Sequence, residues 1–117
     1  MLWSEYKKYS ETHDVTEEKG ILKADYLHDF VLNIWFEENN DVYIYEFDFK
    51  PLLDAKDLGP ALEPLKDIER FSKVIGNFSL NWYDPETGEY NENSIDLSPE
   101  CVRYFCQKFG KLIKKPG

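Results

Sequence analysis

The residues best suited to chemistry lie between Asp84 and Ile95 (DPETGEYNENSI), a stretch dense in carboxylate and amide side chains. Such oxygen atoms are the ligands that Ca²⁺ prefers. A calcium-binding EF-hand loop beginning at Asp84 would need an oxygen ligand at its fifth position, glycine at its sixth and glutamate at its twelfth. The sequence has Gly88, Glu89 and Ile95 there, so all three requirements fail. Because Pro85 and Gly88 favour tight turns, we interpret the stretch as a connecting turn, with partner contact as the alternative, and predict no metal site.

Two cysteines and two histidines supply the remaining reactive groups. Cys101 and Cys106 are five positions apart, which on a helix separates them by about 140° around the axis, so we expect two free thiols that are at least partly buried. His28 is interpreted as a turn or strand-end residue, and His13 has no ligand or nucleophile near it in the sequence. A dyad of Cys106 with His28 is the alternative, since such partners need to meet only in space. The glycines form no phosphate-binding loop, and no catalytic residue or cofactor is predicted.

The composition bounds the class of protein. The 117 residues are 42% hydrophobic and 16% aromatic, which provides enough apolar surface for one folded domain. No stretch approaches the roughly 20 apolar residues of a membrane span, and the first residues lack the apolar core of a signal peptide, so we expect a cytoplasmic protein without a membrane partner. The net charge of −9 repels phosphate backbones and attracts basic proteins. We therefore expect a basic protein partner and no nucleic acid.

A few lysines near the end of the chain run against this acidic balance. We interpret them as charges that favour the last turns of a C-terminal helix through the helix dipole. A nucleic-acid-binding patch is the alternative. The residues are Lys108, Lys111, Lys114 and Lys115.

The chain is expected to divide into an N-terminal arm, residues 1–19, and a single domain, residues 20–117. The arm is polar and is predicted to contain about one helical turn. Trp3, Tyr6 and Tyr9 follow one another at a spacing of three. These rings either pack on the domain or become ordered only on a partner.

Alternating apolar residues predict an antiparallel sheet. Residues 21–27 are expected to form a first strand. Residues 30–38 place alternate apolar side chains from Phe30 to Phe36 on one face, and residues 42–49 place aromatic side chains on every second position. The Asn- and Asp-rich stretch between them favours a turn, so the two strands form a β-hairpin, which ends at Pro51. Trp35 points to the face opposite Phe36.

Helical spacing of apolar residues predicts two helices. One begins at Pro64, and a strand over residues 78–82 follows it. The other begins after Ser98 as N-cap, with Pro99 at its first position. Its apolar stripe is expected to extend beyond Gly110 unless that glycine ends the helix, and comprises Val102, Phe105, Cys106, Phe109, Leu112 and Ile113. The predicted class is α+β: an antiparallel sheet built on a β-hairpin, a short mid-chain helix and a C-terminal amphipathic helix packed on the sheet.

From about Gly20 to Phe105, this order of segments resembles a small bacterial family, domain of unknown function 2442 (DUF2442). The resemblance is carried by LNIWFEENND, by YEFDFKPLL with Asp48 in the aspartate position, and by PLKDIERF, FSLNW and SIDLSPECV. The chain departs from the family's pattern in its hairpin turn, which lacks Asp-Gly, and in a longer loop after Trp82. The resemblance implies an α+β fold, no established enzymatic activity, and an antitoxin-like or regulatory role.

The sequence favours a non-enzymatic protein-interaction module that binds a basic partner. Its contact residues are predicted to be Trp35, Tyr43, Tyr45 and Trp82, as parts of an exposed aromatic surface. For Trp35, burial under the helices or against a second copy in a homo-oligomer is the favoured interpretation, and an exposed Trp35 would mark the partner site. A second hypothesis is a small-molecule-binding or hydrolytic enzyme with a pocket near Trp82 and Asp96. A third, a DNA-binding regulator, would require the terminal lysines to act together with those of a second copy.

Overall fold

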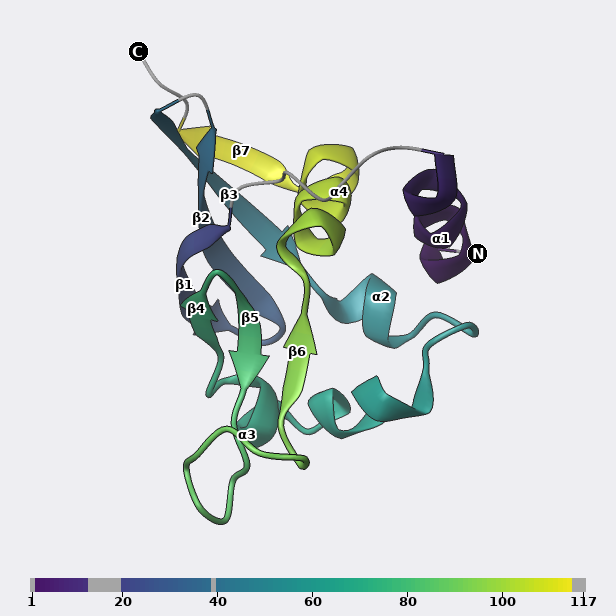
Figure 1. Cartoon of the computed structure of the whole chain (residues 1–117), viewed down its shortest axis with the longest axis vertical. Helices are drawn as coiled ribbons and strands as arrows, with labels where there is room; N and C mark the ends of the chain where they lie inside the picture. Colours follow the sequence, from purple (N-terminus) through teal and green to yellow (C-terminus); the bar gives the residue numbers. More distant parts are fainter. Residues whose placement is uncertain (1, 13–19, 39, 115–117) are drawn as a thin grey trace.

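The computed structural model describes residues 2–12, 20–38 and 40–114. These residues form a four-stranded sheet in the order β1-β2-β3-β7 and a three-stranded sheet in the order β4-β5-β6 (Figure 1). The first sheet comprises β1 (Ile21–His28), β2 (Val31–Glu38), β3 (Asp41–Asp48) and β7 (Lys111–Lys114). The second comprises β4 (Ile75–Asn77), β5 (Ser79–Trp82) and β6 (Ile95–Leu97). The helices are α1 (Leu2–Thr12), α2 (Lys50–Leu53), the 3₁₀-helix η1 (Pro60–Lys66), α3 (Ile68–Phe71) and α4 (Pro99–Phe109).

The predicted β-hairpin is confirmed. β2 and β3 pair in antiparallel register over their whole length. Asn40 contributes to the turn with a left-handed φ of 67°, which asparagine tolerates better than most residues. Side chains alternate across a strand, so Leu32, Ile34 and Phe36 of β2 share one face of the sheet. All three are buried there. We call this the inner face of the four-stranded sheet, and the opposite face, which carries Trp35, the outer face.

The second sheet packs closely against β1, the strand that was predicted over residues 21–27. A Cβ on Gly76 of β4 would lie 2.3 Å from the backbone nitrogen of Ala24, closer than any side-chain atom can approach. Between β4 and β5, Phe78 exchanges two main-chain hydrogen bonds of 2.8 Å with Ile21. The predicted strand over 78–82 is confirmed as β5. The sequence did not predict β4, because three residues are too short to show alternation.

The C-terminal helix is confirmed, and it begins where the sequence predicts. The Ser98 hydroxyl accepts a hydrogen bond from the backbone N–H of Cys101 at 3.4 Å. At the other end the Gly110 N–H donates to the Cys106 carbonyl at 2.8 Å, and the chain then becomes extended. The stripe residues Val102, Phe105 and Cys106 are buried, so α4 covers the inner face of the sheet.

The residues after Gly110 correct one prediction. Leu112 and Ile113 do not continue the helix but belong to β7, which pairs with β3 and places Leu112 opposite Tyr45. The reason is tertiary, since hydrogen bonds to the free edge of β3 are available only in the folded chain. Among the lysines assigned to the last helical turns, Lys108 lies in α4, Lys111 and Lys114 lie in β7, and Lys115 lies outside the described residues.

The N-terminal arm contains a helix, α1, that is longer than the single turn predicted. The ring centroids of Trp3 and Tyr6 lie 5.2 and 5.9 Å from that of Phe105, and the ring centroid of Tyr9 lies 4.8 Å from that of Tyr104. The aromatic side chains of the arm therefore pack on α4, which is the first of the two alternatives.

The predicted mid-chain helix is present, but its extent is different. The chain forms η1 and then α3, because Asp67 between them is extended (φ −77°, ψ 115°). The Asp67 carboxylate accepts a hydrogen bond from the Glu69 N–H at 3.1 Å, so this residue caps α3 instead of continuing η1. A further short helix, α2, follows β3 and has Pro51 in its first turn.

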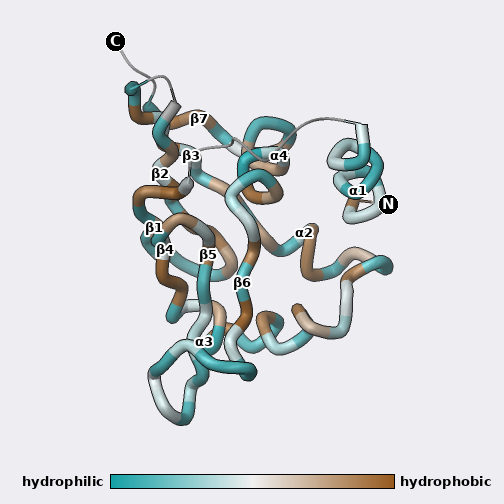
Figure 2. Tube along the Cα trace, viewed as in Figure 1, coloured by the Kyte–Doolittle hydropathy of each residue, from teal (hydrophilic) through white to brown (hydrophobic). Residues whose placement is uncertain are grey.

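The inner face, α4 and the second sheet enclose one hydrophobic core. Phe71 and Trp82 lie within it with no exposed surface. Figure 2 shows hydrophobic residues along the strands and α4, and mainly hydrophilic residues in the loop between β5 and β6. The predicted α+β class is confirmed.

Within the described ranges, no helix has both the length and the apolar character needed to cross a bilayer.

Candidate functional site

The outer face of the four-stranded sheet has no described helix packed on it; α4 contacts the sheet from the inner side (Figure 1). Trp35 lies within this outer face, between Ile44 on β3 and Lys23 on β1. The Lys23 ammonium stands 4.8 Å from the centroid of the indole ring, a cation–π contact. The indole is only partly buried. Trp35 is therefore not covered by any helix that the structure describes.

The other aromatic residues predicted to contact a partner lie elsewhere. Tyr43 and Tyr45 belong to the inner face, where Tyr43 is opposite Phe36 and the Tyr45 ring packs edge-on against Phe36 at 5.9 Å. Trp82 has no exposed surface, and its indole N–H donates to the Phe71 carbonyl at 2.9 Å. Trp82 is part of the core and offers no contact surface. Of the predicted set, Trp35 alone lies on the outer face.

A shallow hollow of about 430 Å³ lies at the edge of the outer face. Leu22 and Phe78 are the apolar side chains there, with exposed fractions of 48% and 60%. Glu37 also lines the hollow, and it points to the same face as Trp35 because the two are two positions apart on one strand. The hollow and the outer face are therefore continuous, and we name Leu22, Trp35, Glu37 and Phe78 the Phe78 corner. The complete lining is Gly20, Ile21, Leu22, Glu37, Asn77 and Phe78.

The backbone holds the Phe78 ring in this exposed position. Phe78 has a left-handed φ of 66°, a conformation that costs a residue with a β-carbon about 1–2 kcal/mol. Its N–H and C=O are both bonded to Ile21. Gly20 leaves space for the ring, because a Cβ there would lie 2.3 Å from Phe78 Cδ2. Backbone strain of this kind often occurs at functional sites, which makes Phe78 the residue of greatest interest on this surface.

The loop between β5 and β6 is organised by hydrogen bonds to Asp84. This carboxylate is 5% exposed and accepts bonds from the Glu86 N–H (2.9 Å) and from the side-chain amides of Asn91 (3.0 Å) and Asn93 (3.2 Å). These bonds, the backbone one foremost, hold the pKa of the Asp84 carboxyl below its ordinary value. Within the described part of the chain, no group of three or more Asp, Glu, His or Cys side chains is placed to hold a metal ion. The segment is a hydrogen-bonded turn.

The two residues expected to line one pocket, Trp82 and Asp96, point to opposite faces of the second sheet. In the pairing of β5 with β6, Asp96 lies opposite Asn81, and neighbouring residues of a strand point to opposite faces, so Trp82 and Asp96 diverge. The Asp96 carboxylate accepts a hydrogen bond from the Tyr90 hydroxyl at 3.1 Å, which raises the pKa of Tyr90. Asp96 thus braces the base of the loop.

Cys106 and His28 do not meet either. Cys106 has no exposed surface, whereas the His28 ring is exposed at the end of β1 and its Nδ1 lies 3.0 Å from Asp29. The Cys106–His28 dyad, which was the alternative interpretation of these two residues, is therefore not formed. His13 lies outside the described residues.

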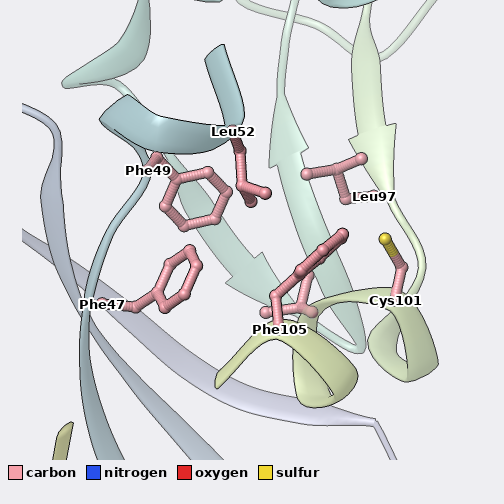
Figure 3. A pocket seen from close by; sticks show the side chains of 7 residues that line it. Phe47, Phe49, Leu52, Leu97, Cys101 and Phe105 are labelled. Carbon is pink, nitrogen blue, oxygen red and sulfur yellow. The ribbon is translucent and has the colours of Figure 1, made fainter. Parts of the chain in front are cut away.

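The expectation that both cysteines are free and buried is confirmed. Burial raises the pKa of Cys101 to about 12 and raises the pKa of Cys106 as well. Figure 3 shows the Cys101 thiol among apolar side chains, around a void that has no room for a water molecule. A thiol in such surroundings stays protonated and is a poor nucleophile. The side chains lining the void are Phe47, Phe49, Leu52, Leu97, Cys101, Val102 and Phe105.

Sequence reasoning found Trp35 but missed Phe78 and Leu22. Phe78 was assigned to the strand predicted over residues 78–82, and its left-handed turn depends on the distant residue Ile21. Leu22 is exposed at a register shift between β1 and β2. No local signal in the sequence marks either exposure.

Comparison of the chain with protein-family models, with curated proteins and with solved structures gave no significant match.

Proposed function

We propose that this chain is a non-enzymatic protein-interaction module that binds a basic protein partner through the Phe78 corner. The observation that carries the proposal is the placement of Phe78, whose ring is 60% exposed while its strained backbone is fixed to Ile21. Large aromatic side chains contribute most to protein interfaces when they enter a pocket on the partner. A partner that covers the ring would gain apolar contact without first having to reorganise this chain.

The proposed charge of the partner rests on the composition. With a net charge of −9, the chain attracts basic proteins over a distance of about 10 Å at moderate ionic strength. Glu37 contributes a carboxylate to the lining of the hollow. The expected interface thus combines an apolar centre at Phe78 and Leu22 with an acidic surrounding.

A cytoplasmic location, membership of DUF2442 and an antitoxin-like or regulatory role belong to the same proposal. The support for the family is the order of the quoted sequence segments, with Asp48 in the aspartate position. The support for an antitoxin-like role is the acidic balance, which suits a protein that neutralises a basic partner.

Affinity capture with the immobilised chain tests the proposal. The variant Phe78→Asn removes the exposed ring, and Tyr90→Asn is the matched control because Tyr90 is 61% exposed in the loop between β5 and β6. We expect a discrete basic protein to be retained at low salt by the wild-type chain and by Tyr90→Asn. Phe78→Asn should weaken its affinity by about tenfold or more, and raising the salt from about 50 mM to about 500 mM should release it.

Two outcomes contradict the proposal. Retention that is equal for Phe78→Asn and the wild-type chain would remove the Phe78 corner from the interface. Retention that does not change with ionic strength would remove the electrostatic component.

A further inference from the structure

Helix α1 lies at the side of the molecule, next to α4 and the region of α2 (Figure 1). It packs through one face, yet none of its residues is fully buried. An isolated helix of 11 residues is only marginally stable in water. The contacts that α1 makes with the rest of the chain therefore decide whether it stays folded and in place.

The polar contacts of α1 are specific. The Trp3 indole N–H donates to the Leu52 carbonyl at 2.9 Å. The Ser4 N–H, in the first turn of α1, donates to Asp57 Oδ2 at 2.9 Å. Asp57 thus acts as a cap supplied by a distant part of the chain, and its charge complements the positive end of the helix dipole. Its second oxygen, Oδ1, is buried and has no hydrogen-bond partner among the described residues.

The apolar contacts follow the same helical face. The Trp3 ring lies edge-on against Phe105, with centroids 5.2 Å apart, and Tyr6 and Tyr9 contact Tyr104 at 5.3 and 4.8 Å. We name the surface that receives the helix the α1 groove and define it by Leu52, Asp57, Tyr104 and Phe105. It recognises a helix with a tryptophan in its first turn and aromatic residues three and six positions later.

The cover that α1 gives to this surface is incomplete. An apolar hollow of about 150 Å³ remains at the N-terminal end of the helix, and Leu2, Pro51 and Phe109 contribute to its lining. Phe109 is 52% exposed. The groove thus keeps apolar surface open while its own helix is bound.

We propose that the α1 groove is a helix-binding site that also accepts α1 from a second copy of the chain, so that two chains exchange their N-terminal helices. Every contact described above is the same in the exchanged pair, because donor and acceptor residues are identical. Residues 13–19 join α1 to β1. In the monomer, α1 binds the groove of its own chain, and in the exchanged dimer it binds the groove of the other chain. The balance between monomer and dimer depends on the effective concentration of the tethered helix, which for a short linker is on the order of 1 mM. Exchange is expected as the chain approaches that concentration.

Mixing two chains that each carry one added cysteine tests this proposal on the full chain. Glu5 and Lys108 form an ion pair of 3.7 Å between α1 and α4, and both side chains are about half exposed, so Glu5→Cys and Lys108→Cys should not disturb the fold. A bis-maleimide about as long as the two replaced side chains can join them across two chains only if α1 of one chain lies on α4 of the other. The native Cys101 and Cys106 are buried and do not compete.

The matched control is Lys8→Cys mixed with Lys108→Cys. Lys8 is exposed and lies about 160° around the axis of α1 from Tyr6, so it reports random collision. We expect the yield of cross-linked heterodimer to rise between about 50 µM and about 1 mM chain and to exceed the control by about fivefold or more at the upper end.

A second substitution separates exchange through the groove from other association. Adding Trp3→Phe to the Glu5→Cys chain removes the indole hydrogen bond to Leu52 but keeps an aromatic ring. Because α1 must leave its groove before it can exchange, and because all contacts are the same afterwards, this variant should speed the formation of cross-linkable heterodimer after mixing and leave its final yield unchanged. A yield equal to that of the Lys8→Cys control at every concentration, or a rate of heterodimer formation that Trp3→Phe leaves unchanged, would overturn the proposal.

Discussion

Phe78 and Ile21 exchange two main-chain hydrogen bonds of 2.8 Å, and this pair joins the turn between β4 and β5 to the first residue of β1. The Ile21 side chain is buried, whereas the Phe78 side chain is exposed. The ring cannot turn into the core unless both hydrogen bonds break and φ leaves the left-handed region. Exposure of this aromatic residue is therefore a property of the backbone, and the first prediction follows from it.

Replacing Phe78 by asparagine should leave the free energy of unfolding unchanged or raise it by up to about 1 kcal/mol, because asparagine tolerates the left-handed conformation. Phe78→Ala removes the same ring but keeps the strain, so it should be less stable than Phe78→Asn. Urea denaturation with linear extrapolation measures both. A loss of more than about 2 kcal/mol in Phe78→Asn would show that the ring belongs to the core.

Alanine in place of Gly76 should destabilise the fold by about 2–3 kcal/mol or more, because its Cβ would collide with the backbone of Lys23 and Ala24. The matched control is Gly59→Ala, where no atom lies within 4 Å of the added Cβ. That variant should be neutral or more stable by about 0.4–1 kcal/mol through the lower entropy of the unfolded chain. Equal melting temperatures for the two variants would mean that β4 and β1 are not in close contact.

Asp84 should make stability depend on pH. Its hydrogen bonds lower the pKa of the folded state below the ordinary value of 3.8, so the charged form stabilises the fold above that value, and this contribution is lost as pH falls through the folded-state pKa. Asp84→Asn lacks the contribution at every pH. The difference between the free energies of unfolding of the wild-type chain and Asp84→Asn should therefore be largest at about pH 6 and should narrow as the pH falls towards about 2. A difference that stays constant over this range would contradict the assignment.

Both thiols should resist alkylation until the chain unfolds. Burial raises the pKa of Cys101 to about 12, so almost no thiolate is present at about pH 8, and the packed core excludes the reagent. Mass spectrometry after iodoacetamide treatment should find no adduct on the native chain and two on the chain in denaturant. An adduct on the native chain before unfolding would show that the region of α4 opens locally.

Elements with local signals could be predicted from the sequence. Strict alternation placed the hairpin correctly, and Ser98 marked the beginning of α4. The break between η1 and α3 could not be predicted, because Leu65, Ile68 and Phe71 fit a continuous helix equally well. Only the extended conformation of Asp67, seen in the structure, shows that η1 and α3 are separate helices.

Features that depend on distant parts of the chain were missed. β7 exists because β3 offers it a free edge, and residues 111–114 alone resemble the end of a helix. The candidate site shows the same limit. Alternation along the strand indicated that Trp35 and Phe36 point to opposite faces of the sheet. The left-handed turn at Phe78, in contrast, depends on its pairing with Ile21, which is distant in the sequence. The sequence therefore indicated one residue of the Phe78 corner and not the hollow beside it.

Photo-crosslinking from position 78 in intact cells tests the central claim most directly. A benzophenone amino acid would replace Phe78 in one chain and Tyr90 in another, two aromatic residues with almost equal exposed fractions of 60% and 61%. The proposed function predicts a discrete adduct with a basic protein from position 78 and none from position 90. The same adducts from both positions, or no adduct from position 78, would contradict it.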